Sequence, residues 1–369
     1  MRILLLTSVD INVKSGGGFA NRAFYDSLTM HYPDCVDVIS CDTCKGSKLR
    51  AIMHGKIHRL SWLLDYLDHH QGVYQVCVIN TGLFGDLVPE IEKRGIRVVT
   101  IHHNYEAVFQ MGNKQAATLW GLTPFFVKRN ERKAYLYSDL NVFLSGYDRQ
   151  MMQAGYGTTN SQNDVVVGVY ETIEHSKATF DVGRHEVQSQ DVAISGRLDH
   201  LQTELGMKDF KDHYYRLLRQ VMPTASRLIV TGRDPRRSIV EFAKKEDVEL
   251  VSSPSSISDV IKDCSIYLCP VNVGSGVKLR ILDGLRLGMP ILTHEVSARG
   301  YEVFADQPWF KAYHDAASFE DGLRTILDFI NQHDDFRHEI ISEYKSHFSF
   351  EAGDQRFIDA LSRLTRGLS

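Results

Sequence analysis

The sequence predicts an α/β protein built from two Rossmann-like domains. Short apolar runs alternate with amphipathic, helix-like segments along the whole chain, as expected for parallel sheets whose strands are buried on both faces. The chain also has 369 residues. At about 150 residues per domain, this length suits two domains, each large enough to bury its own core.

The composition is that of a globular protein, with 43% hydrophobic and 24% charged residues. The net charge of −4 gives no general attraction to nucleic acid, so we expect no nucleic-acid partner. We expect a cytoplasmic protein, because no apolar run reaches 18 residues and the apolar start is too short for a signal sequence. Six cysteines are expected to be reduced, and the single CxxC at Cys41 and Cys44 lacks a second ligand pair, so no metal site is expected.

The expected strands define the domain boundaries. Those of the first half are residues 3–6, 36–39, 74–79, 98–101 and 140–144, with a further apolar run at 165–170. Polar, turn-rich intervals flank this last run, so the first domain is expected to span residues 1–170. The alternation then restarts in a second domain, 171–345, with strands expected at residues 192–195, 228–231, 249–251, 266–269 and 291–293. Residues 346–369 are expected to form a C-terminal helix that packs back on the first domain.

The most informative segment is a glycine turn at residues 274–276. It follows an expected strand, and residues 279–287 after it have helical spacing. Lys278 and Arg280 add two positive charges close to the backbone N–H groups of the expected helix start. The segment therefore predicts a phosphate or diphosphate site, with ordinary helix capping as the alternative interpretation.

Glycines, imidazoles and arginines follow four other expected strands. They are Gly17 and Gly18 after the first strand, His102 and His103 after the fourth, Arg197 after the strand at 192–195, and Gly232 after the strand at 228–231. Ligands of open α/β sheets bind beyond the carboxyl ends of the strands, so two such domains facing each other would form a cleft between these ends. Each position also has an ordinary interpretation: a flexible loop, a core histidine or a surface arginine.

The order and spacing of these motifs resemble the GT-B glycosyltransferases, specifically the retaining family-4 type. The resemblance covers nearly the whole chain and is strongest from about residue 228 to 300. The residues that carry it are the turn 274–276, Lys278, Arg280, Asp283, Gly-Met-Pro-Ile-Leu at 288–292 and Arg-Gly-Tyr-Glu at 299–302.

The resemblance implies a GT-B fold and a nucleoside diphosphate sugar as donor substrate, with UDP or GDP expected as the nucleotide and no separate cofactor. It implies catalytic roles for His103, Arg197 and Arg280. The donor-binding residues that it implies are Gly17, Gly18, Arg197, Gly232, Ser275, Gly276, Val277, Lys278 and Asp283.

The sequence departs from the family pattern at Ser275. The family often has a glutamate there that contacts the donor sugar, and a second glutamate, here Asp283, that contacts the ribose. A serine supplies no charge, which leaves the identity of the donor sugar open. The chain has no Asp-x-Asp triplet to hold a metal against a diphosphate, so cationic side chains are expected to neutralise the leaving phosphate. The resemblance further suggests retention by front-side attack, with His103 supporting the sugar.

We therefore expect a metal-independent hexosyltransferase whose acceptor is a saccharide or a lipid-linked saccharide. A GT-B-shaped partner subunit without catalysis is the alternative, and the serine at position 275 would suit it. A nicotinamide-dependent enzyme is disfavoured, because no G-x-G-x-x-G turn follows the first strand.

Two basic segments raise the question of a membrane partner. Residues 45–67 combine five lysines and arginines with an apolar face at helical spacing, and Lys128, Arg129, Arg132 and Lys133 form a second cluster. Both suit an ordinary helix with a solvated basic face. The alternative is peripheral contact with the inner face of a membrane or with a lipid-linked acceptor.

Overall fold

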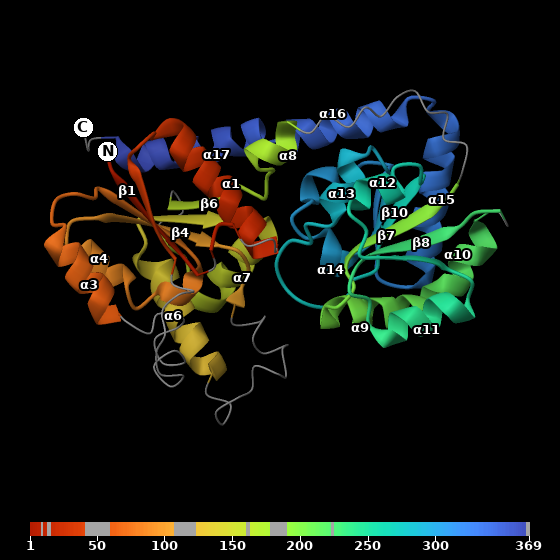
Figure 1. Cartoon of the computed structure of the whole chain (residues 1–369), viewed down its shortest axis with the longest axis horizontal. Helices are drawn as coiled ribbons and strands as arrows, with labels where there is room; N and C mark the ends of the chain where they lie inside the picture. Colours follow the sequence, from red (N-terminus) through yellow and green to blue (C-terminus); the bar gives the residue numbers. More distant parts are fainter. Residues whose placement is uncertain are drawn as a thin grey trace. The chain divides into compact units, whose positions relative to one another are not determined.

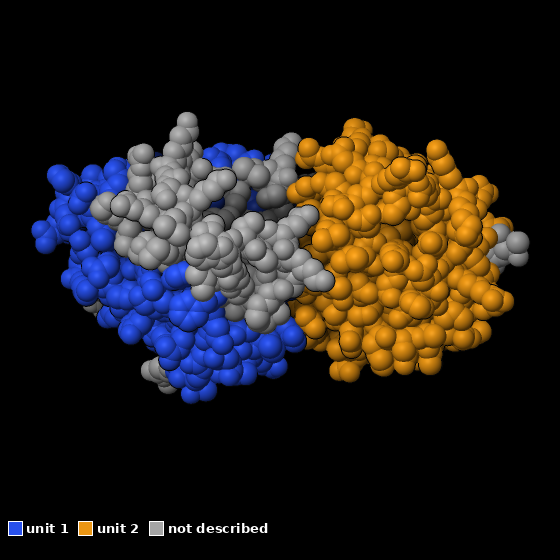
Figure 2. All heavy atoms as spheres, turned by 90° about the horizontal axis from the view of Figure 1, so that it is seen from below, with its two compact units in different colours: residues 1–178, 275–277, 347–369 blue, residues 179–274, 278–346 orange. Residues whose placement is uncertain are grey.

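A computed structural model describes residues 1–8, 10–12, 16–40, 60–106, 123–159, 163–177, 190–222 and 225–366. The chain divides into two compact units (Figure 2). The first comprises residues 1–178, 275–277 and 347–369, and the second comprises residues 179–274 and 278–346.

The first unit contains a six-stranded parallel sheet in the order β2-β1-β3-β4-β5-β6 (Figure 1). Its strands are β1 (Ile3–Thr7), β2 (Val36–Ser40), β3 (Val76–Asn80), β4 (Arg97–His102), β5 (Leu140–Phe143) and β6 (Asp164–Val166). Its helices are α1 (Gly16–His31), α3 (Leu60–His69), α4 (Val88–Glu92), α6 (Thr123–Tyr137), α7 (Gly146–Tyr156), α8 (Ile173–Lys177) and α17 (Phe350–Thr365). The central strands β1, β3 and β5 are buried along their whole length, which explains their mostly apolar sequences.

The second unit contains another six-stranded parallel sheet, in the order β12-β11-β10-β7-β8-β9. Its strands are β7 (Val192–Arg197), β8 (Leu228–Arg233), β9 (Glu249–Ser252), β10 (Ile266–Cys269), β11 (Ile291–His294) and β12 (Phe310–Tyr313). Its helices are α9 (Leu201–Asp209), α10 (Tyr215–Val221), α11 (Arg237–Lys245), α12 (Ile257–Ile261), α13 (Ile281–Arg286), α14 (Glu295–Ala298), α15 (Ala316–Gln332) and most of α16 (Phe336–Phe348). The prediction of two Rossmann-like α/β domains is thus confirmed.

The last helix lies in the first unit. Figure 1 shows α17 beside α1, and the two helices pack together. The side chain of Arg356 donates from Nε to the carbonyl oxygen of Val167 (2.7 Å). A Cβ atom on Gly353 would lie 2.0 Å from Cγ of Tyr170, so the helix backbone approaches that ring closely. The residues that follow β6 are therefore fixed between α1 and α17.

Two strands lie outside the expected set. The strand β6 covers only the start of the apolar run 165–170, because it ends at Val166 and Tyr170 packs against α17 instead of a neighbouring strand. The edge strand β12 was not expected, because its sequence Phe-Lys-Ala-Tyr is short and not uniformly apolar.

The cysteines in the described part of the chain are free, and three of the four, Cys77, Cys264 and Cys269, are buried. Cys41 and Cys44 lie outside the described residues, as do residues 45–59 of the first basic segment. Among the helices that the structure describes, none is long and apolar enough to cross a membrane.

Candidate functional site

The second sheet reverses its strand order between β7 and β10. From β7 the chain builds outward through β8 to β9, and from β10 it builds the other way through β11 to β12. Such a switch point leaves a crevice at the carboxyl ends of the two central strands, where ligands of doubly wound sheets bind. Arg197 ends β7, and the glycine turn 274–276 follows β10, so both predicted motifs lie at this switch point.

Two glycines keep this end of the sheet free of side chains. Gly196 and Gly232 are paired in neighbouring strands and have φ values of 126° and 150°. A Cβ atom on Gly232 would lie 1.7 Å from the carbonyl oxygen of Gly196. A Cβ atom on Gly196 would lie 2.8 Å from Cζ of Arg280, so only glycine lets the Arg280 guanidinium lie against the end of β7.

Arg280 is the basic side chain best prepared for an anion. Its Nη2 donates to Oγ1 of Thr203 (2.9 Å), which fixes the guanidinium plane. Its Nη1 is buried and has no hydrogen-bond partner among the described residues. A buried donor without an acceptor is costly, and an anionic ligand would satisfy it with a charge-assisted hydrogen bond.

Lys278 and Asp283 lie on either side of Arg280 in the same unit. Lys278 is buried, and its carbonyl oxygen accepts a hydrogen bond from the hydroxyl of Tyr301 (3.1 Å), which fixes the backbone there. The carboxylate of Asp283 accepts from Oγ of Ser195 (3.2 Å) and lies 3.5 Å from Nη1 of Arg286. The structure therefore brings the predicted donor-binding residues Lys278 and Asp283 next to Arg280.

The helix start predicted here is wrong by two residues. The helix α13 begins at Ile281 instead of residue 279, and residues 278–280 form a turn. The N–H groups of residues 281–283 bond to the carbonyl oxygens of residues 278–280, so they are already used within the turn. The contribution of the backbone N–H groups of residues 276–279 to an anion site stays a prediction, alongside that of the cationic side chains of Lys278 and Arg280.

The residues of the glycine turn belong to different units. Gly274 belongs to the second unit, has a φ of 101°, and leaves no room for a side chain because a Cβ would lie 2.5 Å from Nε2 of Gln202. Ser275, Gly276 and Val277 belong to the first unit, where a Cβ on Gly276 would lie 3.2 Å from the carbonyl oxygen of His103. The structure thus places two predicted site residues, Gly276 and His103, close to each other.

Arg197 is a weaker phosphate candidate than Arg280. Its side chain is about half exposed, and its Nε donates to Oδ1 of Asp199 (3.1 Å). This carboxylate raises the pKa of the guanidinium and offsets its charge. Gly232 is the last predicted donor-binding residue of this unit. Because it has no side chain, β8 can lie close to Gly196 at the end of β7.

The two histidines of the first unit have different environments. His102 is fully buried at the end of β4, stacks on Phe143 with ring centroids 5.0 Å apart, and contacts Oδ1 of Asn141 through Nε2 (3.0 Å). His103 is only half-buried, and its Nε2 donates to Oδ1 of Asn80 at the end of β3. His102 is thus a core residue, and His103 is the imidazole that a ligand could reach.

Both imidazoles are neutral near neutral pH. Burial lowers the pKa of His102 to about 4. Burial, and to a smaller extent the adjacent His102, lowers the pKa of His103 to about 4 as well. Because Nε2 of His103 donates to Asn80, its Nδ1 is left as a hydrogen-bond acceptor.

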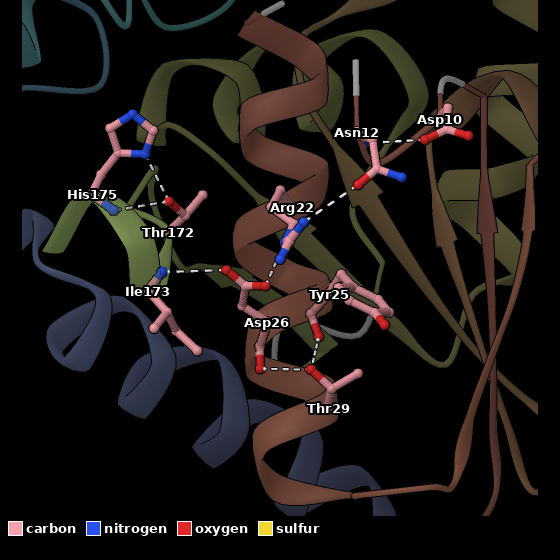
Figure 3. Close-up of polar contacts among 9 residues, drawn as sticks. All are labelled: Asp10, Asn12, Arg22, Tyr25, Asp26, Thr29, Thr172, Ile173 and His175. Carbon is pink, nitrogen blue, oxygen red and sulfur yellow. Dashed lines mark hydrogen bonds and ion pairs between the residues drawn. The ribbon is translucent and has the colours of Figure 1, made fainter. Parts of the chain in front are cut away.

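Gly17 and Gly18 lie in the first turn of α1, which begins at Gly16. A polar side chain of this helix contacts Asn12, which precedes it in the chain (Figure 3). Arg22 of α1 donates to Oδ1 of Asn12 (3.4 Å) and to Oδ1 of Asp26 (2.6 Å). Since β1 pairs with both β2 and β3, the carboxyl end of β1 lies at the switch point of the first sheet.

Sequence reasoning missed the residues that orient the predicted ones. Asn80 directly follows an expected strand, so its position was a usable signal. Tyr301 lies within the predicted motif 299–302, but its contact with Lys278 was not predicted. Thr203 and Tyr267 carry no local signal of a role in the site, because they reach it only through folding.

The remaining predictions concern a metal site and the two basic segments. In the part of the chain that the structure describes, no group of three or more His, Cys, Asp or Glu residues could hold a metal ion. In the second basic cluster, Asp86 binds both Arg129 (3.0 Å) and Lys133 (2.6 Å), which offsets part of its charge. Lys128 and Arg132 are exposed on α6.

Comparisons with known proteins agree with this architecture. Residues 189–328 match the family model described as "Glycosyl transferases group 1", which covers the whole switch-point site of the second unit. No curated protein sequence matches the chain.

Solved structures share the fold along nearly the whole chain. HepE from Anabaena, in complex with UDP, aligns with a TM-score of 0.70 at 13% identity and covers 98% of this chain and 100% of its own. The lipopolysaccharide outer core galactosyltransferase WaaB aligns with a TM-score of 0.68 at 12% identity, covering 98% and 99%. The catalytic domain of starch synthase IV from Arabidopsis thaliana, bound to ADP and acarbose, gives 0.67 at 12% identity, covering 99% of both chains. The fold is thus the GT-B fold of these glycosyltransferases.

Proposed function

We propose that this chain is a glycosyltransferase that moves a hexose-like sugar from a nucleoside diphosphate, UDP or GDP, to a saccharide or lipid-linked saccharide, with retention. The observation that carries the proposal is the Arg280 guanidinium: its Nη2 donates to Thr203, and its buried Nη1 has no acceptor in the part of the chain that the structure describes. It lies within the segment that matches the glycosyltransferase family model. The nucleotides in the structures of HepE and starch synthase IV support a nucleoside diphosphate as the ligand.

In this proposal the second unit stabilises the leaving group. Breaking the bond between the sugar and the diphosphate develops negative charge on the phosphate oxygens. Arg280 and Lys278 neutralise this charge without a metal, and donors fixed in advance are each worth about 3 to 4 kcal/mol in such a role. The Thr203 bond fixes the guanidinium of Arg280, and the Tyr301 bond fixes the backbone of Lys278, so little reorganisation is needed during the reaction.

The first unit contributes a neutral imidazole to the sugar. A His103 whose pKa is about 4 does not repel the positive charge that develops on the sugar ring. Its Nδ1 accepts a hydrogen bond from a sugar hydroxyl, while Asn80 orients the ring. The acceptor loses its proton to a leaving phosphate oxygen in a front-side attack, and the configuration at the sugar is retained.

We further propose that the protein works in the cytoplasm and contacts the inner face of a membrane peripherally. Lys128 and Arg132, both exposed on α6, support this placement, and the exposed Phe125 in the first turn of the same helix adds an apolar group. A lipid-linked acceptor would be reached at such a surface.

A thermal-shift panel tests the proposed function. UDP, GDP, ADP and dTDP, each with and without a hexose, are added to the full chain. A ligand present at 100 times its dissociation constant should stabilise the protein by about 2.7 kcal/mol. If no nucleotide raises the melting temperature, the proposal is wrong.

The same panel separates the enzyme from a silent partner subunit. Release of the free nucleoside diphosphate from the stabilising sugar donor, in the presence of saccharide acceptors, identifies the enzyme. If the sugar donor binds but no nucleoside diphosphate is released from it, either in water alone or with any saccharide acceptor, the chain is the non-catalytic partner subunit that Ser275 would suit.

A further inference from the structure

Three side chains of the second unit form a hydrogen-bonded chain that ends at the predicted ribose carboxylate. Tyr267 of β10 is fully buried, and its hydroxyl lies 2.9 Å from Oγ of Ser195 in β7. The Ser195 hydroxyl, also fully buried, donates to Oδ2 of Asp283 (3.2 Å) in the first turn of α13. The three residues thus come from three elements that converge on the switch point.

The direction of this chain follows from the number of protons. A carboxylate only accepts hydrogen bonds, so the single Ser195 hydroxyl proton points to Asp283. Ser195 Oγ then has only lone pairs to offer Tyr267, so the tyrosine hydroxyl donates to the serine. Tyr267 therefore fixes the rotation of the Ser195 hydroxyl, and Ser195 fixes the carboxylate.

The ring and the hydroxyl of Tyr267 have separate roles, one in packing and one in hydrogen bonding. A Cβ atom on Gly284 would lie 2.6 Å from Cγ of Tyr267, so α13 packs directly on the ring. The ring sets the position of the helix that carries Asp283, and the hydroxyl orients the carboxylate. Replacing tyrosine with phenylalanine removes the second contribution and keeps the first.

The Asp283 carboxylate is a quarter exposed, so it is available to a ligand while Ser195 fixes one of its oxygens. Aspartate is one methylene shorter than glutamate, so its reach toward a ligand depends on where the neighbouring residues place it. The other oxygen of this carboxylate lies 3.5 Å from Nη1 of Arg286, so both neighbours hold the group in place. A site built around a fixed acceptor disfavours a ligand that lacks the matching hydroxyl, because one hydrogen bond to the carboxylate is then lost.

We propose that Tyr267 and Ser195 act as positioning residues that orient Asp283 to accept hydrogen bonds from the ribose hydroxyls of the donor, so that the site selects ribonucleotides over deoxyribonucleotides. This inference rests on the proposed function. It names the class of nucleotide that the site takes and the residues that set this selectivity.

The test measures the dissociation constants of UDP and GDP, and of their 2′-deoxy and 3′-deoxy counterparts, by calorimetry on the full chain. The wild-type protein should bind the ribonucleotide about tenfold or more tightly than at least one deoxy counterpart, the effect of one well-oriented hydrogen bond to a charged group. Ser195→Ala should weaken ribonucleotide binding about tenfold, and Tyr267→Phe about threefold, while binding of that deoxynucleotide changes by less than about twofold.

Tyr313→Phe is the matched control. Tyr313 of β12 is also fully buried in this unit, packs on the Phe319 ring, and has no place in the proposed site. This variant should keep the preference for ribonucleotides, and thermal melting of every variant checks that the fold is retained.

The outcomes separate the two proposals. If Ser195→Ala and Tyr267→Phe weaken ribo- and deoxynucleotides equally, or leave both unchanged, the positioning role is wrong while the proposed function stands. A wild-type protein that binds both kinds of nucleotide equally well also overturns the positioning role. If no nucleoside diphosphate binds at all, the proposed function is wrong and this inference fails with it.

Discussion

The carboxyl ends of β4 and β7 offer different chemistry to a ligand. In the first unit, His103 and Asn80 present neutral groups, and the pKa of His103 is lowered to about 4. In the second unit, Gly196 and Gly232 leave the strand ends without side chains, and Arg280 presents a buried donor that has no acceptor among the described residues. In the proposed function this difference becomes a division of work, in which the second unit binds the diphosphate and the first binds the uncharged sugar.

The largest expected effect is the loss of nucleotide binding when the cations of the second unit are removed. Each of Arg280→Ala and Lys278→Ala should remove a charge-assisted hydrogen bond worth about 1.5 to 3 kcal/mol, and the double variant should lose more than either. Calorimetry with UDP and GDP measures this loss. Arg233→Ala is the control, because Arg233 ends the neighbouring strand β8 but is mostly exposed and paired with Asp234. Unchanged affinity in the double variant would show that the phosphate site lies elsewhere.

The second prediction concerns acid stability and the buried histidine of the first unit. The pKa of His102 is about 4 in the folded chain, against about 6.5 when unfolded. Above pH about 6.5 the ring is neutral in both states. As the pH falls toward 4, the unfolded state takes up the proton first, so about 3 kcal/mol of stability should be lost progressively.

Urea unfolding of the wild type and of His102→Asn, followed between neutral pH and pH about 4, measures this loss. The variant should have a shallower decline in unfolding free energy than the wild type. Parallel declines would contradict the assignment of His102 as a neutral core residue.

The third prediction separates the two neighbouring imidazoles. Replacing the half-buried ring, in His103→Ala, should lower turnover at least about tenfold while UDP affinity stays within about 1 kcal/mol. Replacing the core ring, in His102→Ala, should instead lower the melting temperature. If His102→Ala reduces turnover in a stable protein and His103→Ala does not, the site histidine has been assigned to the wrong neighbour.

Much of the fold of both units was predicted from the sequence, and the predictions that failed did so for physical reasons. Buried parallel strands have continuous apolar sequences, so most strands were located within a few residues. The start of α13 was misplaced because Leu279 continues the apolar spacing of the helix, whereas residues 278–280 form a turn. The sequence left open which of His102 and His103 serves the site, because adjacent residues of a strand point to opposite faces and the pattern alone does not say which face is covered.

The supporting contacts of the second unit were beyond sequence reasoning. Ser195 and Asp283 are 88 positions apart, and Arg280 and Thr203 are 77 apart. No local pattern joins residues at such separations. The predicted motifs therefore located the site, whereas the residues that orient them required the structure.

The smallest expected effect is membrane contact by the basic residues of the first unit. Each exposed lysine or arginine near an anionic surface contributes about 1 kcal/mol, and the attraction decays over a Debye length of about 8 Å at physiological salt. The protein should therefore sediment with anionic vesicles at low salt and not with neutral ones.

Charge reversal locates the membrane contact. Lys128→Glu with Arg132→Glu tests α6, and Lys45→Glu, Lys48→Glu and Lys56→Glu test the first basic segment, which lies outside the described residues. Release from anionic vesicles identifies the responsible segment. Equal recovery in the supernatant with every vesicle would leave both segments as solvated surfaces.

The division of work between the two units is tested most directly by measuring, on one set of variants, how much the sugar adds to nucleotide affinity. The dissociation constants of UDP and UDP-glucose are compared in the wild type, His103→Ala and Arg280→Ala, or those of the diphosphate and hexose donor that the panel selects. Arg280→Ala should weaken both ligands by the same factor, because both carry the diphosphate. His103→Ala should weaken only the sugar-bearing ligand. Equal weakening of both ligands by His103→Ala, or a loss confined to the sugar-bearing ligand in Arg280→Ala, would contradict the account.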